Sequence, residues 1–480
     1  MTKALGLAAL VLLAACHTPA KAPPVQAPIK KDEAKSTPKK AEDKELALEN
    51  AIGVLVEAVL SMSASEYGDA ALSEYVARIG ARVAKRSERP EIVWHFRVTD
   101  TPSIGAHAVP GGRVTITRGL LAYLGSEAEV AAVLAHEIAH VSFRHSHSKW
   151  SPSVAVAEYG DAATAREQAR DADQERQADT VGIRYLAEAG YDPNAMAAAL
   201  AALARGASIE LAAEKKADRT GPNIPSDDDD DFDPHPAPPA RLARASVAAA
   251  GAGKGEWGRE SYLARIAGLE WGDGSSVPVL ERGRWIARGD LSFGIPRGAK
   301  ATIERGSLAL RSSEKGAPEL VAFRLNKSFL SEGLRASLMK GPKTTRTVAG
   351  WSALVARRPD PKAPKKTKDE KKDDSLMAIL DGPERGSVKP VIVVVALGTT
   401  AATERALDAF LATAERDATP ATPQSVLAIE RSEAFVRFDD FIRRRCPGTT
   451  LDIAMALNGR TAADVLPAGD AVKCVKPGAR

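Results

Sequence analysis

One segment of the sequence restricts the fold more than any other. Ser126-Glu127-Ala128-Glu129 has the pattern of a capping box, in which Ser126 accepts a hydrogen bond from the Glu129 amide and the Glu129 side chain reaches back. The chain then continues to Val141 without a glycine or a proline, and apolar residues surround its polar ones. The pattern predicts a long helix that is buried in the protein.

Two histidines and a glutamate lie on this predicted helix, in the order His136-Glu137-Ile138-Ala139-His140. Residues four apart share a helix face, so both imidazoles can bind one ion. Zinc takes about four tetrahedral ligands, and a hydrolytic site keeps one position for water. Glu137 lies beside these ligands, where it can accept a proton from that water. Two surface histidines are the alternative, but the apolar flanks argue against it.

A third ligand has to come from another part of the chain. The next long helix is expected over about 162–189, since Gly190 follows it and Pro193 stands just beyond. On it, Glu175 and Asp179 are four residues apart and share a face. One of them could bind zinc while the other orients a ligand imidazole. Taken alone, the pair would equally fit a solvated helix face.

Together these motifs resemble the metallopeptidase family that includes HtpX, BepA, Oma and the CAAX prenyl protease (peptidase family 48 of the metallo class). The similarity covers about 72–244 and includes the His136–His140 motif and the segment from Glu175 to Asp179. The resemblance implies that Glu175 is the third zinc ligand and that Asp179 supports a ligand from behind. It also implies a mainly helical zincin-type (gluzincin) domain with a small β-sheet and metalloendopeptidase activity.

A later segment, from His235-Pro236 to Arg241, resembles the H-P-x-x-x-x-R segment of the same family, which lies near the zinc. The resemblance implies a regulatory or substrate-side role for His235 and Arg241, in which His235 can close the open zinc position. A lone His-Pro in a loop is the alternative. The acidic run of residues 227–231 just before it is expected to be an exposed loop.

The chain departs from the family at Gly105-Ala106-His107, where the family usually has Asn-Ala-Phe. The departure concerns substrate binding rather than the zinc chemistry. The remaining histidines of this region have no partner at a ligand spacing. We therefore interpret His107 and His147 as surface residues and His145 as structural.

The N-terminus has the features of an export signal. Lys3 is its one charge, and the apolar run that follows is shorter than the roughly 20 residues needed to span a bilayer. The run ends in Leu13-Ala14-Ala15-Cys16, which resembles the lipobox of bacterial lipoproteins and predicts lipidation of Cys16. His17 rather than aspartate after it favours the outer membrane. A plain signal peptide is the alternative.

With 480 residues, the chain is expected to form two or three domains in a multidomain α+β architecture. The other cysteines, Cys446 and Cys474, are expected to form a disulfide in an oxidising compartment, with free thiols as the alternative. The tail is similar to LysM-like units in its Asn-Gly and Leu-x-Ala-Gly patterns. The expected segments are a signal peptide (1–16), a disordered tether (17–45), a zinc metallopeptidase domain (46–255), an α+β domain of unknown role (270–420) with a disordered insertion (359–374), and the LysM-like unit (430–480).

These predictions describe a periplasm-facing peptidase of the bacterial cell envelope that uses one zinc ion. We expect protein substrates that are misfolded or misassembled, lying extended along Arg113–Thr117. Membrane contact through the lipid follows from Cys16, and peptidoglycan is a candidate partner by analogy. The net charge of +4 carries no basic stripe, which argues against nucleic acid. An autoinhibited or non-catalytic chaperone or scaffold with a glycan-binding tail is the alternative.

Overall fold

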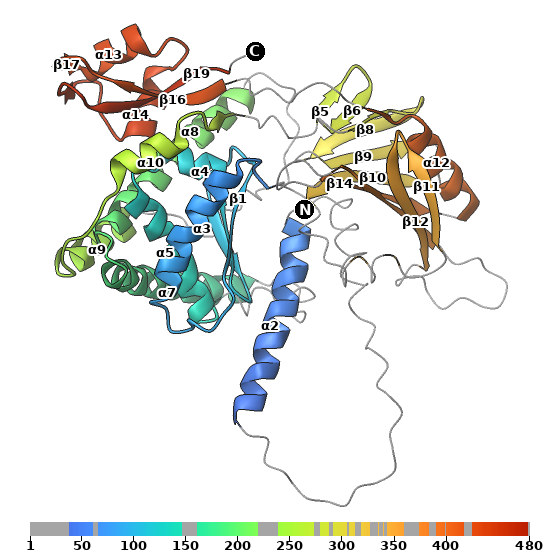
Figure 1. Cartoon of the computed structure of the whole chain (residues 1–480), viewed down its shortest axis with the longest axis horizontal. Coiled ribbons are helices and arrows are strands. Elements are labelled where there is room, and N and C mark those ends of the chain that lie inside the picture. The colour runs from blue at the N-terminus through green and yellow to red at the C-terminus, as the bar shows by residue number, and fades with distance from the viewer. Residues whose placement is uncertain are drawn as a thin grey trace, which may run out of the picture. The chain divides into compact units, whose positions relative to one another are not determined.

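The computed structural model divides the chain into two compact units, which we call the peptidase unit (66–275 with 421–480) and the middle unit (276–420 with the N-terminal residues to 65). Both are shown in Figure 1. The structure describes residues 38–60, 66–145, 161–218, 239–272, 279–287, 291–304, 307–312, 318–326, 335, 339, 343–359, 374–383, 390–398, 400–416 and 425–478.

The peptidase unit is built around helix α5 (Glu127–Ser142), whose residues from Ala128 to Val141 are all buried. The other helices of its first segment are α3 (Ala70–Ala84), α4 (Arg118–Tyr123), α7 (Asp161–Glu188), α8 (Ala195–Asp218), α9 (Pro239–Ala250) and α10 (Arg259–Ile266). On α3 the apolar stripe of Leu72, Val76 and Ile79 is buried as its helical spacing predicts. Helix α5 is therefore the centre of this unit.

A small three-stranded sheet lies in the same unit, with the order β1-β3-β2. Its strands are β1 (His95–Thr99), β2 (Ala106–Val109) and β3 (Arg113–Thr117). β3 is the central strand, parallel to β1 and antiparallel to β2. Between β2 and β3, Gly111 and Gly112 of the sequence Pro110-Gly111-Gly112 both have positive φ angles, which favour glycine, so the turn that this sequence predicts is present.

The C-terminal segment completes this peptidase unit. Its strands and helices are β16 (Ser425–Arg431), β17 (Val436–Arg437), α13 (Phe438–Arg445), α14 (Leu451–Asn458), β18 (Val465–Leu466) and β19 (Ala471–Pro477). β16 pairs with β19 on one side and with β4 (Glu270–Trp271) on the other, so one sheet joins both segments of the unit. A disulfide links Cys446 and Cys474, whose Cα atoms are 5.4 Å apart.

Lys473 connects the C-terminal segment to the first segment of this unit. Its side chain is buried, and its ammonium donates to the backbone carbonyls of Ala122, Tyr123 and Leu124 at 2.8, 3.2 and 2.8 Å. These carbonyls lie at the end of α4, where a helix leaves acceptors without a partner within the helix. The tail therefore caps a helix of the segment that precedes it.

The middle unit contains an antiparallel seven-stranded sheet with the order β11-β12-β13-β14-β10-β9-β8. Both faces of β14 are buried, as the continuous apolar sequence of that strand predicts. On one face Phe410 of α12 stacks on Phe293 at 4.9 Å. The elements are α2 (Pro38–Leu60), β5 (Val279–Glu281), β6 (Arg284–Ala287), β7 (Leu291–Gly294), β8 (Ala299–Glu304), β9 (Ser307–Ser312), β10 (Glu319–Asn326), β11 (Lys343–Val348), β12 (Trp351–Pro359), β13 (Asp374–Asp381), β14 (Pro390–Gly398), α12 (Thr400–Ala412) and β15 (Glu415–Arg416).

Two expected boundaries change. The tether was expected to extend to residue 45, but α2 begins at Pro38, because the alanine, lysine and glutamate residues that follow are strong helix formers. The apolar spacing after β14 predicts a helix over Thr403–Arg416, but α12 ends at Ala412, and Glu415–Arg416 pairs with β7 instead. The signal peptide with Cys16, the acidic run and the insertion between Pro359 and Asp374 lie outside the described residues.

We predict that Lys473→Met lowers the free energy of unfolding of the protein by about 1–3 kcal/mol, because buried carbonyls lose their donor. Burial lowers the pKa of Lys473 to about 7, whereas the usual lysine value is 10.5. Between these two pKa values Lys473 is more protonated in the unfolded chain than in the folded protein. The free energy of unfolding of the wild type should therefore rise with pH in this window relative to that of Lys473→Met. Denaturant unfolding at pH 7 and pH 9 measures both effects. A difference in unfolding free energy between wild type and Lys473→Met that shrinks as pH rises would contradict the prediction.

Candidate metal centre and active site

Helix α5 begins where its sequence predicts. Ser126 accepts from the Glu129 amide at 3.2 Å, and the Glu129 carboxylate reaches back to the Gly125 amide at 2.8 Å. Further along, at His136, α5 packs closely against α7. A Cβ atom on Gly182 of α7 would lie 3.3 Å from the backbone nitrogen of His136, so glycine allows this approach. The two helices can therefore place side chains around a common point.

Three of the expected ligands converge between α5 and α7. The Nε2 atoms of His136 and His140 are 3.0 Å apart, and the two carboxylate oxygens of Glu175 lie 3.2 and 3.3 Å from them. Two ligands about 2.0–2.1 Å from a tetrahedral ion are separated by roughly 3.4 Å, so this spacing fits one zinc ion. His136, His140 and Glu175 are the group of described residues that can hold a metal.

Asp179 and Arg241 surround the other side of His136. Asp179 is 3.0 Å from the Nδ1 atom of His136, and Arg241 binds Asp179 through two nitrogens at 2.7 and 2.8 Å. Arg241 also lies 2.9 Å from a Glu175 oxygen. The two sites predicted separately, on the α7 helix and on the segment around residue 241, thus form one buried network.

The charges of this network shift the pKa values of its members. Burial alone would lower the pKa of His136, but hydrogen bonds with Asp179 and Glu175 outweigh burial and raise it to about 9. Burial would raise the pKa of Asp179, whereas Arg241 and His136 hold it below its usual value. The site therefore carries negative charge next to the imidazoles and favours a bound cation.

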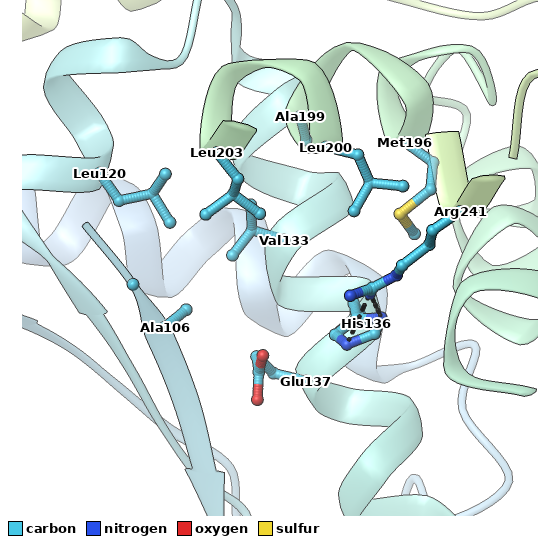
Figure 2. A pocket seen from close by; sticks show the side chains of 11 residues that line it. Ala106, Leu120, Val133, His136, Glu137, Met196, Ala199, Leu200, Leu203 and Arg241 are labelled. Carbon is cyan, nitrogen blue, oxygen red and sulfur yellow. Dashed lines mark hydrogen bonds between the residues drawn. The ribbon is translucent and has the colours of Figure 1, made fainter. Parts of the chain in front are cut away.

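Glu137 points away from this network into an adjoining cavity (Figure 2). The cavity has a volume of about 30 Å³ and lies between α5, α8 and β2. Apart from its polar members His136, Glu137 and Arg241, its walls are apolar or small. Those wall residues are Gly105, Ala106, Leu120, Val133, Met196, Ala199, Leu200 and Leu203. The Glu137 carboxylate thus lies between the candidate metal ligands and a cavity that can receive an apolar side chain.

The strand beside this cavity differs from the expected one. Substrate was expected along Arg113–Thr117, but β3 is bonded to strands on both sides and has no free edge. The edge strands are β1 and β2, and Ala106 of β2 lines the cavity. The prediction was wrong because sequence alternation identifies strands but does not show which of them is central.

His145 was interpreted as structural, and the structure places it against a candidate metal ligand. Its Nδ1 atom lies 3.0 Å from the Nδ1 atom of His140, and its Nε2 atom lies 3.0 Å from the Gln177 side-chain oxygen. Sequence reasoning found no contact partner for His145, because it has no ligand spacing, and missed Gln177 for the same reason. The sequence offers one signal for their contact. His145 is a polar residue just after the end of α5, and Gln177 is a polar residue between Glu175 and Asp179.

The remaining candidate residues fall in two groups. His107 is half-buried on β2, rather than fully exposed as expected for a surface residue. His147 and His235 lie outside the described residues, so the expected role of His235 at the open metal position stays a prediction.

A buried helix with two histidines and a glutamate, completed by a glutamate from a second helix that could share a metal ion with the histidines, is typical of a metallopeptidase domain. Residues 70–249 match the model of peptidase family M48. This match confirms the resemblance of this segment to the metallopeptidase family, and zinc is the cofactor that the ligand set fits.

Individual relatives agree with this assignment. The chain is 29% identical over 174 residues to the beta-barrel assembly-enhancing protease of Yersinia pestis, covering 31% of this chain and 36% of that protein. It is 32% identical over 154 residues to a putative beta-barrel assembly-enhancing protease of Vibrio cholerae, covering 27% and 32%. Against the mitochondrial metalloendopeptidase OMA1 of Schizosaccharomyces pombe, identity is 31% over 153 residues, covering 27% and 45%. The chain thus spans 32% to 45% of the length of these relatives.

We predict that Arg241→Ala lowers the free energy of unfolding of the metal-free protein by about 3–5 kcal/mol, because it leaves buried carboxylates without their partner. Arg241→Lys should recover only part of this loss, since an ammonium cannot make the two parallel bonds to Asp179. Arg244, exposed on the same helix, provides the matched control Arg244→Lys. Equal stability of Arg241→Ala and wild type in urea unfolding would show that the network is not structural.

Proposed function

We propose that this protein is a zinc-dependent endopeptidase of the bacterial cell envelope that hydrolyses peptide bonds of misfolded or misassembled envelope proteins. One observation carries the proposal. The ligand set of His136, His140 and Glu175 adjoins a cavity into which Glu137 points, so ligand atoms and a proton acceptor share one space. The family match and the protease names of the relatives support the same reaction class.

In this mechanism, His136, His140 and Glu175 hold the ion, which when bound polarises a carbonyl and lowers the pKa of a water. Glu137 accepts the proton of the attacking water and delivers it to the departing amine. Asp179 holds the imidazole of His136 by its Nδ1 atom, so that the Nε2 atom faces the ion. Arg241 keeps both α7 carboxylates in place.

Substrate binding is proposed at the edge of β2. An extended peptide can add to an edge strand through backbone hydrogen bonds, which read little sequence. The adjoining cavity would then take one side chain of the peptide. At about 10–15 Å³ per water, its volume of about 30 Å³ has room for two or three waters, so a small aliphatic side chain fits best.

The location in the envelope rests on sequence. Cys16 within Leu13–Cys16 supports a lipoprotein that faces the periplasm, with the outer membrane favoured over the inner one. The disulfide between Cys446 and Cys474 supports an oxidising compartment. A LysM-like, peptidoglycan-binding role of the tail rests on the short sequence patterns described above.

The test of the reaction is Glu137→Gln, which removes the proton acceptor and keeps the size of the side chain. We expect hydrolysis of casein and of unfolded outer-membrane proteins to fall by at least about 100-fold while bound zinc is unchanged. Glu188→Gln on the exposed face of α7 is the matched control. Zinc content by mass spectrometry and cleavage by gel electrophoresis decide the outcome. Full activity of Glu137→Gln would favour another base, and a wild type that binds zinc but never cleaves would favour the chaperone alternative.

A second test concerns the cavity. Ala199→Leu should lower kcat/KM about tenfold for peptides with valine next to the cleaved bond and leave peptides with glycine there unaffected, because the added methyl groups occupy the space. Ala207→Leu, exposed on the same helix, is the control. Fluorogenic peptides that differ at this one position provide the measurement. A uniform loss on both peptides would argue against a side-chain pocket.

A further inference from the structure

We propose that His145 is the residue that positions His140 for metal binding, by accepting a hydrogen bond from the Nδ1–H of His140 while donating to Gln177. The proposal rests on the proposed zinc site and names a support for its second ligand. His136 has such a support in Asp179, whose carboxylate lies 3.0 Å from its Nδ1 atom. His145 occupies the equivalent place behind His140.

The backbone places His145 through the way in which α5 ends. The His145 amide donates to the His140 carbonyl at 2.9 Å, and the Arg144 amide donates to the Val141 carbonyl at 3.1 Å. These two bonds form a Schellman motif, which requires a left-handed residue between the helix and His145. Arg144 takes that conformation, with φ of 57°, although glycine would adopt it at lower cost. The chain reverses there and brings the imidazole of His145 back over the last turn of the helix.

The hydrogen bonds then fix the tautomers of both imidazoles. Metal binding needs the lone pair of the His140 Nε2 atom, so the proton of a neutral His140 must be on Nδ1. That proton points to the Nδ1 atom of His145 at 3.0 Å, which must therefore accept. The proton of His145 is then on Nε2, where the Gln177 oxygen lies at 3.0 Å to accept it. The opposite tautomer of His145 would push the His140 proton onto the metal-facing nitrogen.

The same geometry argues against two other roles for His145. The residue is not an additional metal ligand, because it lies against Nδ1 of His140, whereas Glu175 and His136 lie against Nε2. Simple core packing would not need one ring nitrogen of His145 to face a donor, on His140, and the other to face an acceptor, on Gln177. Gln177 belongs to the same turn of α7 as Glu175, so one helix supplies a ligand and the end of this chain of bonds. His145 therefore connects the end of α5 to the ligand-bearing turn of α7.

The experiment compares His145→Leu, which keeps the bulk and removes the acceptor, with His145→Asn, whose side-chain oxygen replaces Nδ1. We expect His145→Leu to weaken zinc binding by about 10–100-fold and His145→Asn to stay within about threefold of wild type. Arg144→Gly should keep wild-type affinity because glycine accepts the same turn, and His95→Leu on β1 controls for the loss of a histidine. Zinc dissociation constants come from competition with a chelating dye, and circular dichroism checks folding.

A second readout does not depend on any variant. In zinc-loaded protein with 15N-labelled histidine, NMR should show His140 protonated on Nδ1 and His145 protonated on Nε2. Wild-type zinc affinity in His145→Leu, an equal loss in folded His145→Leu and His145→Asn, or the reverse His145 tautomer would each overturn the proposal. Failure of the proposed function has a different signature, since the wild type itself would then bind no zinc or cleave nothing.

Discussion

The close contact between α5 and α7 is the constraint on which the site depends. Gly182 lets the α7 backbone approach His136, and this approach brings a glutamate oxygen within about 3.3 Å of each histidine nitrogen. Buried charges are tolerated only when they are paired or bind metal, so this contact needs the network that surrounds it. Arg241 from α9 supplies positive charge to both α7 carboxylates. Packing and electrostatics therefore act on the same few residues.

Much of this site could be predicted from the sequence because its geometry is local. A capping box starts α5, and the spacing of four residues places His136 and His140 on one helix face. The pairing of α5 with α7 is not local, and only the resemblance to a known family indicated Glu175. The role of Asp179 beside His136 was implied in the same way, and the structure adds that Arg241 binds it.

What the sequence did not reveal depends on backbone reversals and on sheet order. Arg144 has a left-handed conformation with no glycine to signal it, so nothing in the sequence indicated that His145 returns to His140. The order of the small sheet places β3 in the centre and β2 at the edge, although Arg113–Thr117 has the clearer strand pattern. The contact of Lys473 with α4 joins residues 349 or more positions apart, beyond any periodicity argument. Each of these features arises from tertiary packing.

The tail also supports the walls of the cavity. Lys473 holds the end of α4, which carries Leu120, and Arg205 of α8 donates to the Ala456 carbonyl of α14. Because the middle unit is inserted between the two segments, the peptidase unit is discontinuous in sequence. A ribosome delivers β16 and β19 only after more than a hundred residues of another unit. The nascent chain thus lacks part of the scaffold around the cavity until β16 and β19 have been synthesised.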